Sequence, residues 1–223
     1  MGFTRVGEVK YLRVNPSRRI IFFDLDGTLH QQDIFSSFIY WLLWHHLLNL
    51  FLLLPLLPVV GAGLLIQGRT TRWPISLVLW SITFGHRESI LLKREEKFVR
   101  WFCRRLTPFQ KVRQRLLDYL RYENTDVWLI TGSPQSLVAR VYSNAVFFPR
   151  VMLIASQMAR AYGGRVLVMR CVGNEKVSQL IQRIGKPLQI ESGYSDSNQD
   201  NPLLFFCQNR FRVTRLGEIK DMD

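Results

Sequence analysis

The fold is decided by residues 19–28, RIIFFDLDGT, where a short apolar run ends in two aspartates, a glycine and a threonine. An apolar run of this length, closed by a turn signal, predicts a buried β-strand over residues 19–25. Asp24 and Asp26 then stand at the carboxyl end of a strand, where open parallel sheets place their ligand sites. Two carboxylates this close repel each other unless a cation offsets their charge. A simple polar turn accounts for the same residues, so this motif alone leaves both interpretations open.

Three later segments carry polar residues where further strands of the same sheet should end: 130–134 (ITGSP), 174–176 (NEK) and 194–200 (YSDSNQD). The first follows a predicted strand over 126–130 and opens a helix, a place where hydroxyl and N–H groups can hold a phosphate. Lys176 begins another predicted helix, and the last segment follows a predicted strand over 188–194. Taken singly, Lys176 is typical of a solvated lysine and 194–200 of a polar loop. The alternation of strands and helices predicts an α/β domain with a Rossmann-like, largely parallel sheet.

Together FDLDGT, LITGS, Lys176 and GYSDSNQD resemble motifs one to four of the haloacid dehalogenase superfamily. The resemblance covers residues 18–30 and 126–214, and it implies a phosphatase that forms an aspartyl-phosphate. It assigns Asp24 as the nucleophile and Asp26 as the group that protonates the leaving alkoxide and then activates water. It also implies phosphate binding by Thr131, Gly132 and Lys176, and Mg²⁺ binding by Asp24, Asp26, Asp196 and Asp200.

The physical chemistry agrees with these implied roles. A carboxylate that attacks a phosphate dianion meets like-charge repulsion, which a cation on the phosphoryl oxygens reduces. Mg²⁺ prefers oxygen ligands and keeps several waters, so a few carboxylates and a substrate phosphate suffice to hold it.

Residues 31–123 form a predicted helical cap inserted into a catalytic core made of residues 1–30 and 124–223. Residues 34–68 of this cap contain no Asp, Glu, Lys or Arg. A helix without a polar face predicts a membrane-embedded segment, since burying it all round inside a soluble core would need a larger protein. The strands on both sides of it must meet at one site, so a single complete span is excluded. We expect a helical hairpin bent near residues 55–63, or a pairing of one span with the apolar residues 73–84.

The chain carries 30 Lys and Arg against 17 Asp and Glu, a net charge of +13. Such an excess indicates a polyanionic partner, and the apolar segment favours an anionic phospholipid membrane over nucleic acid. His45 and His46 lie in the apolar segment, so we expect them at the membrane interface and not at a metal. Cys103, Cys171 and Cys207 form no CxxC pair, which predicts reduced thiols in a cytosolic setting. No apolar stretch typical of a signal peptide occurs in the first thirty residues.

Further segments narrow the expected substrate. The stretches FDLDGTLHQQD, LPLLP, RWPISLVLW, TFGH, RVMLIASQ and GYSDSNQDNPLL resemble the phosphatidylglycerophosphatase C family of the bacterial inner membrane. The resemblance implies removal of the terminal phosphate of phosphatidylglycerophosphate to give phosphatidylglycerol, with the active site facing the cytoplasm. Two alternatives stay open. One is a phosphatase for a lysophospholipid, a polyprenyl phosphate or a soluble phosphoserine-like ester, and the other is a non-catalytic membrane adaptor. The oligomeric state is not predicted.

Overall fold

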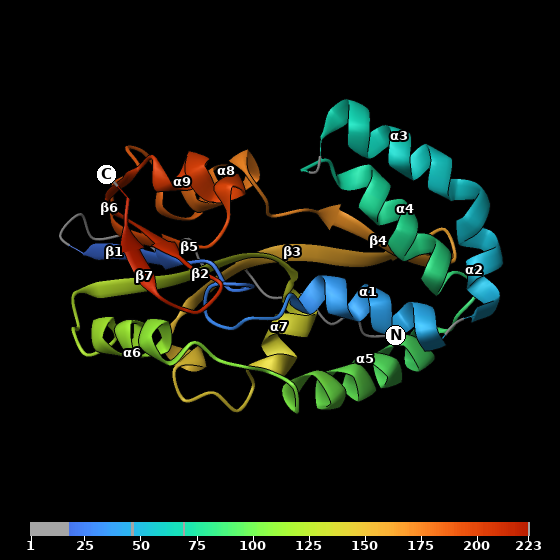
Figure 1. Cartoon of the computed structure of the whole chain (residues 1–223), viewed down its shortest axis with the longest axis horizontal. Helices are drawn as coiled ribbons and strands as arrows, with labels where there is room; N and C mark the ends of the chain where they lie inside the picture. The colour runs from blue at the N-terminus through green and yellow to red at the C-terminus, as the bar shows by residue number, and fades with distance from the viewer. Residues whose placement is uncertain (1–17, 46, 69, 223) are drawn as a thin grey trace, which may run out of the picture.

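The computed structural model describes residues 18–45, 47–68 and 70–222; residues 1–17 of the predicted core and His46 lie outside these ranges. Within them one sheet has the strand order β4-β3-β2-β1-β5-β6-β7 (Figure 1). Its strands are β1 (Arg19–Phe23), β2 (Thr125–Pro134), β3 (Met152–Ala161), β4 (Gly164–Met169), β5 (Ile190–Ser195), β6 (Cys207–Val213) and β7 (Ile219–Asp221). The strands from β3 to β6 in this order are parallel, whereas β4 and β7 are antiparallel edges. The predicted α/β fold with a largely parallel sheet is confirmed.

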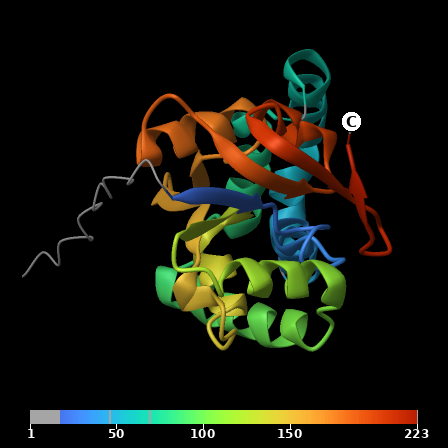
Figure 2. The same ribbon diagram turned by 90° about the vertical axis from the view of Figure 1, so that its left-hand side faces the viewer.

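Helices cover both faces of this sheet. They are α1 (Ile34–His45), α2 (Leu47–Leu53), α3 (Leu57–Gln67), α4 (Arg72–Thr83), α5 (Glu88–Cys103), α6 (Gln110–Tyr119), α7 (Gln135–Val141), α8 (Asn174–Ile184) and α9 (Asn201–Leu204). Three 3₁₀ turns, η1 (Leu54–Leu56), η2 (Phe148–Arg150) and η3 (Asn198–Asp200), complete the described helical elements. Helices α8 and α9 lie on one face and α6 and α7 on the other, which gives the three layers visible in Figure 2.

Strand β1 is buried on both of its faces because successive side chains point to opposite sides of a strand. Ile21 and Phe23 belong to the hydrophobic cluster that includes residues of α1, α5, α6 and α7. Ile20 and Phe22 belong to the cluster that includes residues of α8 and α9. This double burial explains the unbroken apolar run before Asp24, and it fixes the position of the strand end that carries the acidic pair.

Helices α1 to α5 lie beyond one end of the central strands. Together with the hairpin β3–β4, which extends past those strands, they form what we call the helical unit (Figure 1). Helix α4 packs against β4, so the unit contains a β-hairpin from outside the predicted cap of residues 31–123. The guanidinium of Arg165 on β4 forms ion pairs with Glu95 and Glu88 of α5. Helix α6, the last helix of the predicted cap, instead packs against β2 in the core.

The predicted hairpin reversal near residues 55–63 lies further along the chain. Helices α2 and α3 change direction at the 3₁₀ turn η1, at the start of the predicted range (Figure 1). The chain nevertheless stays helical from Leu48 to Gln67 and reverses only after Gly68, whose φ of 81° lies in the left-handed region that glycine tolerates. Helix α4 then returns against α2 and α3. The apolar helix therefore packs against the helix over residues 72–83, the neighbour named in the alternative, and its insertion in a membrane stays a prediction.

Residues 201–213 are divided between a short helix and a strand. Helix α9 ends at Leu204, and residues from Cys207 onward form β6 beside β5. Cys207 and Val213 are buried on this strand, whereas Gln208 and Asn209 are exposed. The intervening polar residues obscured the strand periodicity, and the neighbouring strand β5 supplies the backbone partners that select this conformation.

The helix over Leu48–Gln67 is long and apolar enough, by length and composition, to cross a membrane, and it is the one such helix in the described ranges. Only 17% of its most apolar stretch is buried. Leu48, Phe51, Leu65 and Ile66 are among the most exposed hydrophobic residues of the chain, at 83, 76, 88 and 82%. An apolar surface this large on a folded domain is typical of a site that contacts another protein or a membrane.

Candidate active site

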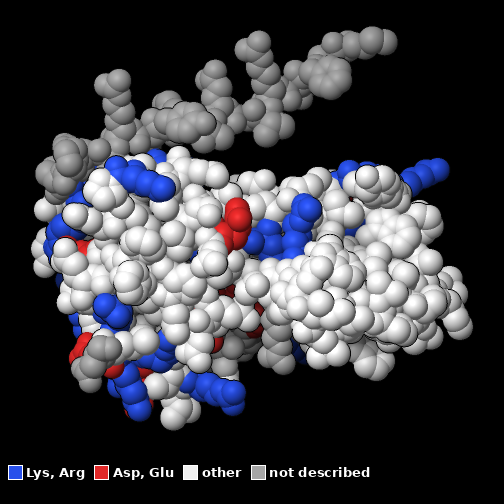
Figure 3. All heavy atoms as spheres, turned by 90° about the horizontal axis from the view of Figure 1, so that it is seen from above, with Lys and Arg blue, Asp and Glu red and all other residues white. Residues whose placement is uncertain are grey.

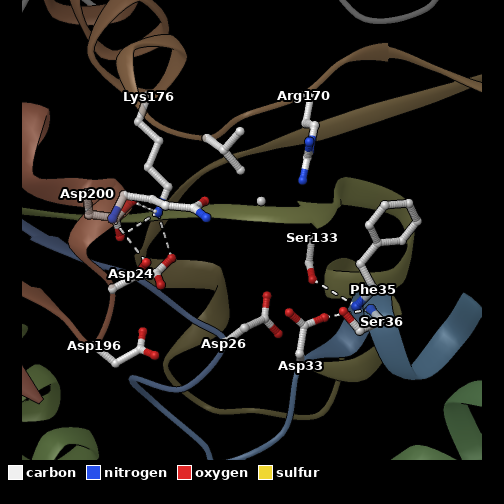
Figure 4. A pocket seen from close by; sticks show the side chains of 14 residues that line it. Asp24, Asp26, Asp33, Phe35, Ser36, Ser133, Arg170, Lys176, Asp196 and Asp200 are labelled. Carbon is white, nitrogen blue, oxygen red and sulfur yellow. Dashed lines mark hydrogen bonds and ion pairs between the residues drawn. The ribbon is translucent and has the colours of Figure 1, made fainter. Parts of the chain in front are cut away.

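The predicted acidic residues meet around one cavity of about 280 Å³ at the carboxyl end of the central strands. The predicted site residues that line it are Asp24, Asp26, Gly132, Lys176, Asp196 and Asp200 (Figure 4). They come from the ends of β1, β2 and β5, from the turn η3 and from the start of α8, at the edge where parallel strands place their ligands. Thr131 is the one predicted residue that does not line the cavity.

Lys176 is the centre of a buried ion-pair network. Its Nζ lies 2.8 Å from Oδ1 of Asp24 and 2.7 Å from Oδ1 of Asp200, and its side chain is only 3% exposed. Ser195 donates a further hydrogen bond of 2.7 Å to Asp200. Burial alone would lower the pKa of Lys176, but the charges of Asp200 and Asp24 outweigh it and raise that pKa. Lys176 is therefore a fixed positive charge beside Asp24.

Asp26 is held by groups from two other segments. Its Oδ1 accepts a 2.8 Å hydrogen bond from the backbone N–H of Ile34, and its Oδ2 accepts one of 3.0 Å from the hydroxyl of Thr131. Burial raises the pKa of Asp26 to about 7, and the charge of Asp33 adds to this shift. A carboxyl with such a pKa can carry a proton near neutral pH, which a general acid requires. Thr131 thus contacts Asp26 in this structure, and its phosphate-binding role stays a prediction.

The turn after Asp26 brings Asp196 into the site. Gly27 has a φ of +76°, and a Cβ built there would lie 2.4 Å from Oδ2 of Asp196, so only glycine fits. The hydroxyl of Thr28 donates a hydrogen bond of 3.2 Å to Oδ1 of Asp196. The same hydroxyl accepts a hydrogen bond of 3.0 Å from the backbone N–H of Asp196. The DGT turn therefore links the ends of β1 and β5 and fixes two carboxylates at one end of the cavity.

The donor set fits a magnesium ion. Asp24, Asp26, Asp196 and Asp200 line this cavity with a single lysine, so its acidic end carries an excess of negative charge that a divalent cation offsets. In the described part of the chain no three His, Cys, Asp or Glu side chains form a ready-made metal cage. Mg²⁺ does not need one, because it usually binds through one or two carboxylates and keeps several waters.

The cavity also contains residues that the sequence motifs did not single out. Ser133 lies within the predicted LITGS segment, and its hydroxyl accepts a 3.1 Å hydrogen bond from the N–H of Phe35. Asp33 caps the start of α1 through a 2.6 Å bond from the N–H of Ser36. Arg170 follows β4 and carries no motif of its own, so only the fold reveals that it lines this cavity.

His30 is a second neighbour of Asp26 that the motifs did not assign. Its ring is fully buried, and Nε2 lies 3.9 Å from Oδ1 of Asp26. Burial lowers the pKa of His30 to about 4, so the ring is neutral at physiological pH.

Residues 21–204 match the family of haloacid dehalogenase-like hydrolases. The chain therefore belongs to the haloacid dehalogenase-like hydrolase family.

Solved structures with the same fold include a protein of unknown function from Bordetella pertussis Tohama I, with 20% identity and a TM-score of 0.61 over 87% of this chain and 89% of that one. A phosphoserine phosphohydrolase-like protein from Francisella tularensis subsp. tularensis SCHU S4 has 14% identity and a TM-score of 0.56, over 89% and 88% of the two chains. A phospho-aspartyl intermediate analogue of phosphoserine phosphatase has 12% identity and a TM-score of 0.55, over 87% and 85%. At these identities the likeness describes the fold.

Proposed function

We propose that the chain is a magnesium-dependent phosphatase that removes the terminal phosphate of phosphatidylglycerophosphate through an aspartyl-phosphate on Asp24. The main support for this proposal is that Asp24 and Asp26 line one cavity beside the buried Lys176. The adjoining helical unit contributes the exposed apolar helices α2 and α3. Family membership supports hydrolysis, and the resemblance to the phosphatidylglycerophosphatase C family supports the lipid substrate.

In this mechanism a carboxylate oxygen of Asp24 attacks phosphorus, and the bond from phosphorus to the lipid glycerol oxygen breaks. Asp26 gives its proton to that leaving oxygen, then takes a proton from the water that hydrolyses the acyl phosphate. Lys176 holds Asp24 in place and offsets charge on the phosphoryl oxygens. Gly132 and Ser133 present the end of β2 to the same phosphoryl group. Carboxylate oxygens of Asp24 and Asp196 and the backbone carbonyl of Asp26 would hold Mg²⁺, supported by Asp200, and the ion would neutralise phosphate charge.

The membrane part of the proposal concerns the helical unit. Helices α2 and α3 would lie in the inner membrane of a bacterium, with the catalytic cavity on the cytoplasmic side. The parallel pairing of β1 with β2 supports this arrangement, because it returns the chain to the same site after the apolar helices. The net charge of +13 suits the anionic lipid surface and does not require nucleic acid.

A phosphatase for a soluble ester is the second candidate, favoured by the fold likeness to phosphoserine phosphatase structures. The test is release of inorganic phosphate by the purified protein in detergent with Mg²⁺. Phosphatidylglycerophosphate, a lysophospholipid, a polyprenyl phosphate and phosphoserine would be compared by kcat/KM. The highest value should belong to phosphatidylglycerophosphate. A higher value for phosphoserine would overturn the lipid assignment, and no release from any ester would overturn the phosphatase.

Chelation should abolish activity. Treatment with EDTA should remove phosphate release, and Mg²⁺ should restore it, because the carboxylate cluster needs a cation before it can accept a phosphate dianion. Ca²⁺ should inhibit, since its larger and looser coordination shell lets both oxygens of Asp24 bind metal and misaligns the attack. The measurement is phosphate release after dialysis against EDTA and titration with each cation. Undiminished turnover in the chelated protein would contradict the metal role.

Membrane association should depend on the exposed face of α2 and α3. We expect the wild-type protein in the membrane fraction of lysed cells. A variant in which four residues of the apolar face are changed to Gln should be released into the supernatant, because these side chains are exposed and apolar. The four residues are Leu48, Phe51, Leu65 and Ile66. The matched control changes Val146 and Leu216 to Gln, since they are 85 and 84% exposed but lie outside the helical unit. Recovery of the wild type in the supernatant, or retention of the fourfold variant on membranes, would refute this arrangement.

A further inference from the structure

The catalytic cavity continues away from the acidic residues toward Arg170. Arg170 lines this cavity together with Asp24, and its side chain points into it from the side opposite the carboxylates (Figure 4). Its Nη1 donates a 2.6 Å hydrogen bond to the backbone carbonyl of Thr71, which directs the guanidinium toward the start of α4. The cavity therefore has two electrostatic ends, one built from Lys176 and carboxylates and one that contains a guanidinium.

A second hollow, of about 400 Å³, begins at this guanidinium. It shares Arg170 and Val172 with the catalytic cavity, and Thr70 and Arg72 line its far side. Nη1 of Arg72 donates to the carbonyl of Val168 at 2.6 Å, which fixes this arginine between α4 and β4. Two arginines thus line one hollow next to the catalytic cavity, with Glu175 as its one acidic residue.

A third hollow, of about 650 Å³, continues from Arg72 along α4 and is mainly apolar. It shares Arg72 and Val168 with the second, and its wall contains Trp73, Leu77, Trp80, Val166 and Leu167. In Figure 3, atoms of Lys and Arg (blue) lie between atoms of Asp and Glu (red) near the centre and the almost uniformly white surface of the helical unit. The order along the surface is therefore a phosphatase centre, a pair of arginines and an apolar groove.

This order matches the chemistry of a glycerophospholipid with a phosphorylated headgroup. Such a molecule carries a terminal phosphomonoester, then a phosphodiester, then acyl chains. Guanidinium groups bind phosphate oxygens through charge-assisted and bidentate hydrogen bonds, so a pair of arginines suits the phosphodiester. Phosphoserine has neither a phosphodiester nor an acyl chain, and its carboxylate is the one anionic group that it could offer to these arginines.

We propose that Arg170 and Arg72 form a second anion site, which binds the phosphodiester of the lipid while its phosphomonoester lies at Asp24, and that the groove along α4 receives the first part of one acyl chain. This inference rests on the proposed function, since it needs a substrate with both phosphates. Arg170 is then a specificity-determining residue of the same enzyme.

The test is steady-state kinetics of Arg170→Gln and Arg170→Lys with phosphatidylglycerophosphate in mixed micelles. The glutamine variant should raise KM at least about tenfold, the effect of losing one charge-assisted hydrogen bond, and leave kcat within about twofold. The lysine variant keeps the charge and should recover part of the affinity. Arg72→Gln should act in the same direction. Arg121→Gln is the matched control, because this exposed arginine just after α6 lines none of the three hollows.

A second readout uses phosphatidylglycerol, which carries the phosphodiester but no phosphomonoester. Its inhibition constant should rise in Arg170→Gln by the same factor as KM, and a loss of folding would instead lower kcat and the melting temperature. An unchanged KM and inhibition constant, or a fall in kcat alone, would overturn the second anion site while leaving the phosphatase intact. Wild-type protein that hydrolyses another monoester but not phosphatidylglycerophosphate would overturn the proposed function, and this inference with it.

Discussion

The substitution Asp24→Asn should lower phosphate release by several powers of ten and leave the fold intact. The amide is nearly isosteric with the carboxylate but is a very poor nucleophile, so the covalent step is lost. The neutral side chain also reduces the repulsion among Asp24, Asp196 and Asp200, which burial makes costly. Its melting temperature should therefore equal or exceed that of the wild type.

The measurement combines phosphate release with acid trapping of radiolabelled phosphoenzyme. Wild-type protein should retain label after denaturation and Asp24→Asn should not. Asp118→Asn is the matched control, because the partners of Asp118 on α6 lie on its own helix and the following turn. Phosphate release at the wild-type rate by Asp24→Asn would rule out the aspartyl-phosphate mechanism.

The substitution Lys176→Met should be costly for both stability and activity. It keeps the unbranched shape and most of the length of the side chain but removes the charge that pairs with Asp24 and Asp200, whose side chains are only 9 and 2% exposed. Breaking a buried ion pair by removing one partner typically costs about 3–5 kcal/mol, because the remaining charge is left uncompensated. Turnover should fall as well, since Asp24 loses its positioning contact.

Chemical denaturation measures the stability loss, and saturating Mg²⁺ provides an informative second condition. If a cation is held by the same carboxylates, Mg²⁺ should recover part of the lost stability by binding the folded state. Lys111→Met on the exposed side of α6 is the control and should change neither quantity. A Lys176→Met protein as stable and active as the wild type would show that the network has no energetic role.

The residues that follow a strand were predictable from the sequence. Asp24, Asp196 and the LITGS segment each follow an apolar run, and parallel pairing of β1 with β2 and β5 brings these ends together. Family motifs then supplied Lys176, which its surroundings in the sequence would not have distinguished from a surface lysine. Arg170 could not be found in this way, because its position depends on the packing of β4 against α4 and not on any local pattern.

The misplaced reversal has an equally specific cause. Pro55 and Pro58 are the second residues of η1 and α3, near the start of a helical segment, where a missing N–H is tolerated. They divide the helical path into segments, but they do not reverse it. Gly63 allows α3 to approach α4 closely and does not bend α3, since a Cβ at this position would lie 2.3 Å from the ring of Trp73 on α4. Composition alone does not distinguish a glycine that bends a helix from one that lets two helices approach.

Strand β3 runs without interruption from the core sheet, where it pairs with β2, into the helical unit, where it pairs with β4. The ion pairs of Arg165 with Glu95 and Glu88 join the same hairpin to α5. A wide swing of the helical unit away from the sheet would have to bend this strand or separate these buried charges. The entrance to the catalytic cavity therefore keeps a nearly constant width, and it does not depend on a hinge motion of the helical unit. The proposed lipid substrate would then enter and leave by lateral movement, parallel to the membrane surface in which its acyl chains remain.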